Sequence, residues 1–195
     1  DDLIPFYPNP NPNYRIVKYC SVVPGSLGTT LIKIAGAGPV KITGSALSAA
    51  QTFATTLGFP GLIYNVVSLD PDKLFLQVDV FFNGLYSGVI QGNVIAAIDN
   101  YLATIPFDGK VDVLDLQIAI RAVPGVTSLL VINAKVREDL VGFPGGISLI
   151  QNYTEINKDF QTVAGYIVKE TTSGKTLTDY RVGSSGPLNL NLIPV

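Results

Sequence analysis

The sequence predicts an α+β fold in which small mixed sheets are covered by short amphipathic helices. Three observations predict this class. Apolar and polar residues alternate over residues 74–82, which is the period of a strand with one buried face. Apolar residues recur at three- and four-residue steps over residues 87–104, as they do on one face of a helix. Such strand and helix patterns are interspersed along the chain, as expected when helices cover a sheet.

The first third of the chain predicts two strands and a helix. Residues 14–23 are rich in β-branched and aromatic types, and residues 29–35 alternate in part, with the turn Pro24-Gly25 between them. Ser45 is the expected N-cap of a helix over residues 45–57, which Gly58 ends. The expected buried stripe of this helix consists of small and apolar residues: Ala46, Ala50, Phe53, Ala54 and Leu57.

The middle of the chain continues with strands and helices. Residues 62–68 and 74–82 predict strands on either side of the turn Leu69-Asp70-Pro71-Asp72. The helix over residues 87–104 ends before Pro106. Residues 111–122 fit both a strand and a helix, and we favour a short helix capped by Asp112.

The last third predicts mainly strands. Residues 126–135 return to a strand pattern, whereas residues 138–161 carry little signal. Further strands are expected over residues 163–169 and 177–182, with a hairpin turn at Ser173-Gly174 between them. The apolar end, residues 188–195, is expected to be extended and to pack on this chain or on another.

Three regions follow from these patterns. Residues 1–13 form a proline- and asparagine-rich segment that is either a linker or an arm packed on a neighbouring subunit. Residues 14–140 form the α+β region, which in one interpretation divides into subdomains of residues 14–70 and 71–140. Residues 141–195 are expected to be a β-rich C-terminal extension. Because the chain begins with Asp1 and contains no methionine, we expect a processed chain or a fragment.

Composition excludes several classes of function. The chain has 195 residues, of which 47% are hydrophobic and only 14% charged, against about 25% charged in an average domain. A net charge of -2 excludes a broad basic face for nucleic acid. The sequence lacks an apolar run of about 18 residues, so we expect no membrane insertion. The absence of histidine removes the commonest general base and zinc ligand, and the single cysteine excludes an internal disulfide.

The candidate chemical groups all have simpler structural interpretations. Asp70-Pro71-Asp72 is expected to be a solvated turn, and Asp79 to lie on the polar face of its strand. Asp108, Asp112 and Asp115 cluster where carboxylates favour the start of a helix.

The glycine-rich stretches and the cysteine are no more specific. Residues 36–39 and 142–146 lack the continuation that a phosphate-binding loop needs, so turns explain both. Cys20 is expected to be a buried small hydrophobe. We therefore predict no catalytic, cofactor-binding or metal-binding residues, no cofactor and no enzymatic activity.

A combination of short motifs in the first two thirds of the chain points to a family. Residues 22–36 read VVPGSLGTTLIKIAG, in which a turn is followed by a strand that ends in Ala-Gly. The small-residue helix over residues 45–57 and the strand Leu76-Gln77-Val78-Asp79-Val80 come next. Residues 94–109 read VIAAIDNYLATIPFDG. The turn before the strand over residues 126–135 reads Ala122-Val123-Pro124-Gly125-Val126. Over residues 16–140 the chain resembles the C-terminal half of baseplate J-like proteins.

The resemblance implies a structural role. Members of that family are wedge subunits of contractile phage tail baseplates and related injection machines, and their pattern contains no catalytic residues. It implies a virion location, contacts with other baseplate and tail proteins and with copies of the chain itself. Residues 188–195 are then expected to add to a neighbour's sheet edge, and both chain ends to present apolar patches. The alternative is a secreted or cell-surface module whose tyrosines and phenylalanines line a ligand face.

Overall fold

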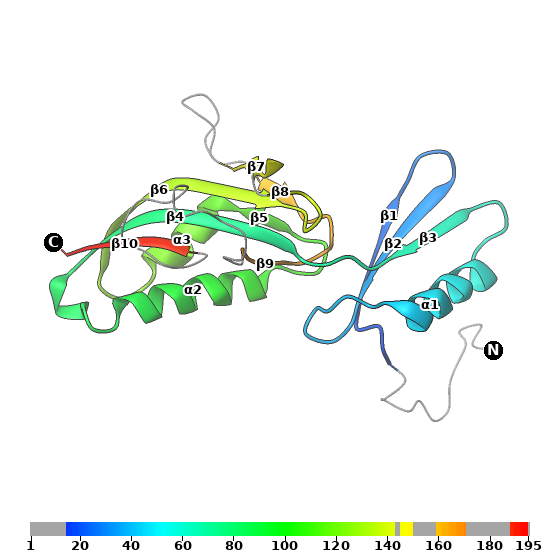
Figure 1. Ribbon diagram of the computed structural model, residues 1–195, viewed down its shortest axis with the longest axis horizontal. Helices are drawn as coiled ribbons and strands as arrows, with labels where there is room; N and C mark the ends of the chain where they lie inside the picture. Colours follow the sequence, from blue (N-terminus) through cyan, green and yellow to red (C-terminus); the bar gives the residue numbers. More distant parts are fainter. Residues whose placement is uncertain (1–14, 143–144, 150–158, 171–187, 195) are drawn as a thin grey trace, which may run out of the picture. The chain divides into compact units, whose positions relative to one another are not determined.

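The chain folds into two compact units. The computed structural model describes residues 15–142, 145–149, 159–170 and 188–194. Unit 1 is Asp1–Leu69 and unit 2 is Asp70–Val195. Each unit combines its own sheet with its own helices (Figure 1), so the α+β class predicted from the sequence is confirmed. The residues beyond 140 that form strands belong to unit 2.

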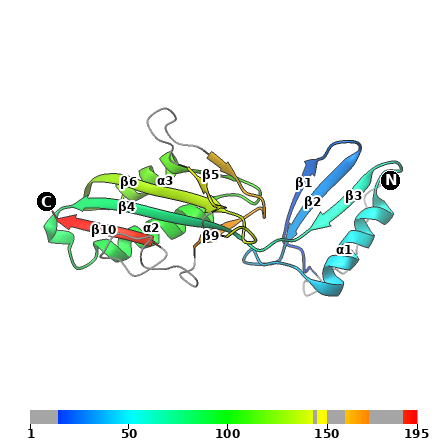
Figure 2. The same cartoon turned by 45° about the horizontal axis from the view of Figure 1, so that its top comes forward.

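Unit 1 is a three-stranded sheet with one helix. Strands β1 (Tyr19–Pro24) and β2 (Thr29–Ala35) form an antiparallel hairpin. Helix α1 (Gly44–Leu57) then leads to β3 (Ile63–Val67), which pairs parallel with β2 and completes the order β1-β2-β3. The connection from an antiparallel hairpin through a helix to a parallel strand places α1 on one face of the sheet (Figure 2).

The core of unit 1 is small. Its centre consists of Ile34, Ile42 and Val66, against which α1 packs mainly through alanines. None of the side chains of α1 is fully buried. Two of the five residues expected in the buried stripe, Phe53 and Leu57, are more than half exposed, so that expectation was wrong for them.

The start of α1 also differs from the expectation. Thr43 is the N-cap, and no side-chain hydrogen bond caps the helix. Gly44 has a φ of +62°, a left-handed conformation that glycine adopts without a steric penalty. The chain therefore enters the helix at Gly44, which leaves Ser45 inside the first turn.

Unit 2 contains a sheet of five strands. Its centre is β4 (Asp72–Phe82), which pairs antiparallel with β6 (Val126–Arg137) and parallel with β10 (Leu188–Pro194). Strand β9 (Ile167–Lys169) pairs with the start of β4, and β7 (Ile147–Ser148) pairs with β6.

Two helices cover one face of this sheet. Helix α2 (Ile90–Thr104) follows a 3-10 turn, η2 (Gly84–Tyr86), and α3 (Val113–Arg121) follows the short strand β5 (Lys110–Asp112). Strand β5 pairs with β8 (Asp159–Gln161) in a separate two-stranded sheet. The core on this face is contributed mainly by β4, α2, α3 and β6, and its fully buried residues include Leu74, Leu76, Val78, Val80, Ile90, Val94, Ile98, Val113, Leu116, Ile120, Ala134 and Val136.

Several sequence predictions for unit 2 are confirmed and others need correction. Helix α3 forms with Asp112 as its N-cap, as predicted. Helix α2 begins at Ile90, later than the expected residue 87, because Asn83 Oδ1 accepts a hydrogen bond from Leu85 N and holds the 3-10 turn. Only residues 167–169 of the expected strand over 163–169 are a strand. The expected strand over 177–182 and its hairpin turn lie outside the described residues.

The C-terminal strand lies on its own chain. Residues 188–194 form β10, which pairs with β4 from Leu76 to Phe82 in unit 2. Of the two alternatives expected for this segment, packing on this chain or on another, the first is confirmed. The edge of β4 offers seven residues of backbone partners within the same molecule, so pairing there needs no second chain.

Candidate functional site

The carboxylates near α3 stabilise local structure. Asp112 Oδ1 accepts a hydrogen bond of 2.6 Å from Leu114 N, and the Tyr101 hydroxyl bonds to both the backbone N and O of Asp112. Burial of the Tyr101 ring is the main reason that the pKa of its hydroxyl is raised. Asp115 lies in the first turn of α3, where negative charge is favourable. Asp108 has a φ of +61° in the turn before β5.

The turn Leu69-Asp70-Pro71-Asp72 is partly buried, and the expectation of a solvated turn was wrong for Asp72. Asp72 is 1% exposed, and its Oδ2 accepts hydrogen bonds from Val163 N at 2.7 Å and Ala164 N at 3.2 Å. A buried carboxylate is retained when backbone donors compensate for its lost hydration. Asp72 therefore fixes the segment before β9 against the start of β4, a structural role that the sequence interpretation missed.

Asp79 shares a face of β4 with Gln77, as expected from alternation, but both residues are only 8% exposed. This is the face of β4 opposite Leu76, Val78 and the helices. Strand β4 is paired on both sides, with β6 and with β10, so neither of its edges is open to solvent. Alternation along the strand alone does not reveal this position.

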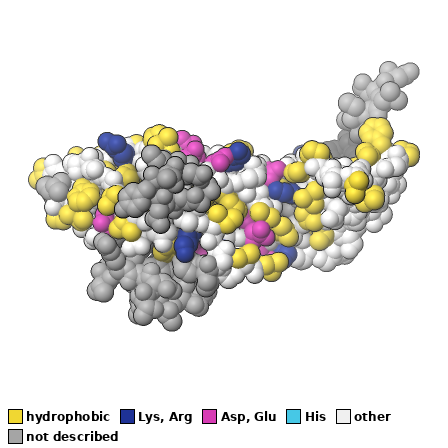
Figure 3. Space-filling view, turned by 90° about the horizontal axis from the view of Figure 1, so that it is seen from above, with side chains coloured by type: hydrophobic (Ala, Val, Ile, Leu, Met, Phe, Trp, Pro, Cys, Tyr) yellow, Lys and Arg dark blue, Asp and Glu magenta, His cyan; other side chains and the backbone are white. Residues whose placement is uncertain are grey.

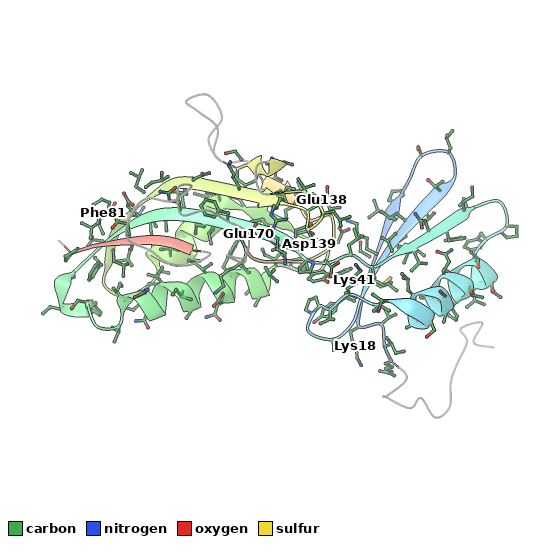
Figure 4. All side chains as sticks on the ribbon, viewed as in Figure 1. Lys18, Lys41, Phe81, Glu138, Asp139 and Glu170 are labelled. Carbon is green, nitrogen blue, oxygen red and sulfur yellow. The ribbon has the colours of Figure 1, made fainter. Side chains whose placement is uncertain are left out.

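A buried ion pair joins β6 to the segment after β9. Arg137 Nε and Nη2 donate to the two carboxylate oxygens of Glu170 at 2.6 and 2.7 Å, and Glu170 is 2% exposed. The hydrogen bond to Glu170 is the main reason that the pKa of Arg137 is raised. Glu170 lies near Glu138 and Asp139 at one end of unit 2 (Figure 4). Arg137 Nη1 also donates to three backbone carbonyls, those of Glu138, Asp139 and Val141.

The remaining candidates are the cysteine and the two glycine-rich stretches. Cys20 is exposed on β1, which contradicts the expected burial, and partial desolvation by its neighbours raises the pKa of its thiol. Gly36 N donates to Val40 O, and Gly145 N to Gly142 O, so both glycine-rich stretches contain hydrogen-bonded turns. The described part of the chain holds no group of three or more His, Cys, Asp or Glu placed to bind a metal ion.

The prominent surface feature of unit 1 is exposed apolar area that carries few charges. Residues 42–69 contain no charged side chain, and residues 3–69 contain no Asp or Glu. Space-filling representation shows hydrophobic side chains interspersed with uncharged ones over this unit, in the right-hand part of Figure 3. Eleven large apolar side chains of unit 1 are exposed: Ile16, Val17, Tyr19, Val22, Leu27, Val40, Phe53, Leu57, Phe59, Leu62 and Ile63.

The position of α1 explains part of this exposure. Gln51 on α1 bonds through its side chain to Tyr64 O and Val66 N of the edge strand β3. These bonds hold the helix over the β3 side of the sheet, so that β1 on the other side is left uncovered (Figure 1). Val22, which pairs with Ile32 and shares its face, is consequently 61% exposed.

Comparison of the sequence with protein-family models and with curated proteins finds no match. Among the described residues, none of the helices is both long and apolar enough to cross a membrane.

Proposed function

We propose that this chain is a structural subunit of a phage-type contractile tail baseplate, a wedge component that acts through protein–protein contacts. The observation that carries the proposal is the apolar surface of unit 1, which is weakly charged and lacks any charged side chain over residues 42–69. The resemblance of its motifs to those of baseplate J-like proteins is the reason for proposing a tail baseplate as the assembly. On this proposal the protein is located in the virion and contacts other baseplate and tail proteins and copies of itself.

The balance between core and surface in unit 1 supports an assembly role. Among its described residues, few apolar side chains are buried: Ile34, Ala35, Ile42 and Val66. Small units bury a small fraction of their surface and are correspondingly marginal in stability. Each apolar side chain covered by a partner adds roughly 25 cal/mol per Å² of buried area. A partner that covers the exposed apolar side chains of unit 1 would therefore both stabilise this unit and favour association.

The lack of charge is consistent with the centre of an interface. Charged residues are depleted at the cores of protein–protein interfaces, and aromatic residues are enriched there. Phe53 and Phe59 are both more than half exposed within the uncharged stretch of residues 42–69. Unit 2 adds a second apolar face on α3, where Leu114 and Ile118 are about half exposed at positions i and i+4.

The proposal is tested by purifying contractile tail particles from the organism that encodes the chain. Quantitative mass spectrometry is expected to find this chain in a fixed integer ratio to the sheath-proximal baseplate proteins. Its absence from particles that contract normally would overturn the proposal. Secretion of the chain together with saturable binding of a glycan would instead favour the cell-surface binding module.

A further inference from the structure

Strands β9 and β10 lie one after the other along the same edge of β4. Strand β6 pairs with β4 from Lys73 to Phe82 and therefore occupies its other edge. Strand β9 pairs parallel with residues 72–74 of β4, and β10 pairs parallel with residues 76–82. Only Phe75 separates the two registers, yet residues 170–187 lie between the two strands in the sequence. The connection is therefore far longer than the path along β4 requires.

The length of this connection allows β10 to reach a second molecule. Residues 171–187 lie outside the described residues, and their number alone sets an upper limit of roughly 55 Å on the distance that they span. Strand β4, with 11 residues, spans about 36 Å. A strand that follows such a connection is able to pair with its own β4 or with the β4 of a neighbouring copy.

The chain is anchored on the sheet of unit 2 before β10 begins. Glu170, the residue after β9, donates from its N to Leu74 O at 2.8 Å and forms the buried ion pair with Arg137. Upstream of β9, Asp72 Oδ2 accepts a hydrogen bond from Val163 N at 2.7 Å. These contacts attach the chain to both β4 and β6 as far as Glu170, whichever edge β10 occupies.

Strand β10 is peripheral to the core of unit 2. The buried core residues that the structure describes lie on other elements, and Leu192 is the described side chain of β10 that packs against them. The larger contribution of β10 is the backbone ladder along residues 76–82 of β4. Release of β10 therefore opens one edge of β4 and leaves the helices and β6 in place.

The sequence of β10 matches the edge on which it lies. Residues 188–192 alternate leucine and asparagine, and residues 76–80 alternate apolar side chains with Gln77 and Asp79. The register places Asn189 opposite Gln77 and Asn191 opposite Asp79, so polar residues face polar ones. A shift by one residue would reverse every side chain of the strand. A second copy of this chain carries the same strand, so its β10 fits this edge equally well.

We propose that β10 is exchanged between two copies of this chain, so that β10 of each copy pairs with β4 of the other. The exchanged pair keeps the ladder of the closed form, and its cost is mainly the freedom of motion lost on association. The register of β10 and the length of residues 170–187 identify the partner, because both are properties of this chain. The inference rests on the proposed assembly role, in which the exchanged strand is one contact between subunits.

The test uses two complete chains, each with one new cysteine in a Cys20→Ser background. One chain carries Asp79→Cys and the other carries Asn191→Cys, at positions that face each other across the ladder. Neighbouring strands lie about 4.8 Å apart, which a disulfide bridges. The two chains are unfolded together in urea, refolded at high concentration and oxidised. We expect a disulfide-linked heterodimer, because neither chain contains a partner cysteine of its own.

Gln77→Cys in place of Asp79→Cys is the matched control. Both side chains are 8% exposed on the same face of β4, but Gln77 lies two residues out of register with Asn191. That offset places the two cysteines about 8 Å apart, beyond the roughly 7 Å at which a disulfide forms without movement of the backbone. The mixture of this variant with Asn191→Cys is expected to lose the linked product.

Sedimentation velocity of the unmodified chain gives an independent measurement. A chain refolded at high concentration is expected to contain a dimer that persists after dilution, because its return to monomer requires the whole ladder to separate. A monomer at every concentration would overturn the proposal. A dimer whose cysteine variants stay unlinked would also overturn it, as would equal linkage of Gln77→Cys and Asp79→Cys. If the variants stay unlinked while the chain is found in tail particles, the exchange is refuted and the assembly role stands.

Discussion

The buried pair Arg137–Glu170 provides a quantitative test of how unit 2 is held together. Glu170→Gln keeps the shape of the side chain and removes its charge. Glu170 is 2% exposed and accepts two hydrogen bonds from Arg137, whose side chain is 15% exposed. The amide offers one acceptor where the carboxylate offered two, so one guanidinium N–H loses its partner and the buried cation loses its counter-charge.

Removing one member of a buried ion pair costs about 3–5 kcal/mol, because the remaining charge is left uncompensated. The slight exposure of Arg137 places the expected loss near the lower end, at about 3 kcal/mol. The measurement is urea unfolding of the complete chain, followed by tyrosine fluorescence with the transition of unit 2 assigned by hydrogen exchange. Protection is expected to fall first in β9, which immediately precedes Glu170.

Two further variants make this test specific. Asp159→Asn breaks a pair of similar length, Lys110–Asp159 at 2.6 Å, whose side chains are both exposed, and it is expected to leave the unfolding midpoint unchanged. The double variant Arg137→Leu with Glu170→Leu is expected to be less destabilised than Glu170→Gln, since it removes both charges. If Glu170→Gln and Asp159→Asn have equal effects, the pair does not hold β9 in place.

Three other perturbations test separate parts of the fold. Asp72→Asn is expected to destabilise unit 2 by about 2 kcal/mol, because its Oδ2 accepts from two backbone N–H groups; a change near zero in urea unfolding would contradict this. Burial of Tyr166, and to a lesser extent the charge of nearby aspartates, raises the pKa of its hydroxyl from 10.0 to about 12. The free energy of unfolding is therefore expected to fall as the pH rises from 10.0 to about 12, because the hydroxyl ionises first in the unfolded state. Ultraviolet titration of Tyr166→Phe should lack the last tyrosine to ionise, and an unchanged titration would refute the assignment. In unit 1, Gly58→Ala places a methyl 2.1 Å from the Tyr64 ring and is expected to cost about 2 kcal/mol, whereas full retention of the melting temperature would show that the ring moves freely.

Local sequence signals predicted the elements whose stability is local. Helix α3 begins at Asp112 because a carboxylate bonds to a backbone N–H two residues away, which the sequence alone indicates. Strand β2 has the predicted bounds, residues 29–35, because a run of strand-forming residues lies between two glycine-containing turns. Helix α2 begins later than predicted, at Ile90, because a 3-10 turn competes with its first turn and is held by a single hydrogen bond that the Asn83 side chain accepts from Leu85 N.

The candidate interaction site was only partly predictable. The sequence indicated a weakly charged exterior and apolar chain ends. It did not indicate that the β1–β2 turn and the α1–β3 loop lie side by side, because that contact depends on the parallel pairing of β2 with β3. The stripe of α1 was misassigned at Phe53 and Leu57 because the hydrogen bonds of Gln51, and not apolarity alone, set the rotation of the helix.

The sequence by itself determined the α+β class, the order of the longer strands and helices up to β6, and the uncharged character of residues 42–69. Only the tertiary structure decided that Asp72 is buried, that β10 pairs within its own chain and that the β1–β2 turn lies beside the α1–β3 loop. Local patterns report on interactions over a few residues. Asp72 and its partner Val163 are 91 residues apart, and such contacts depend on the folding of the whole unit.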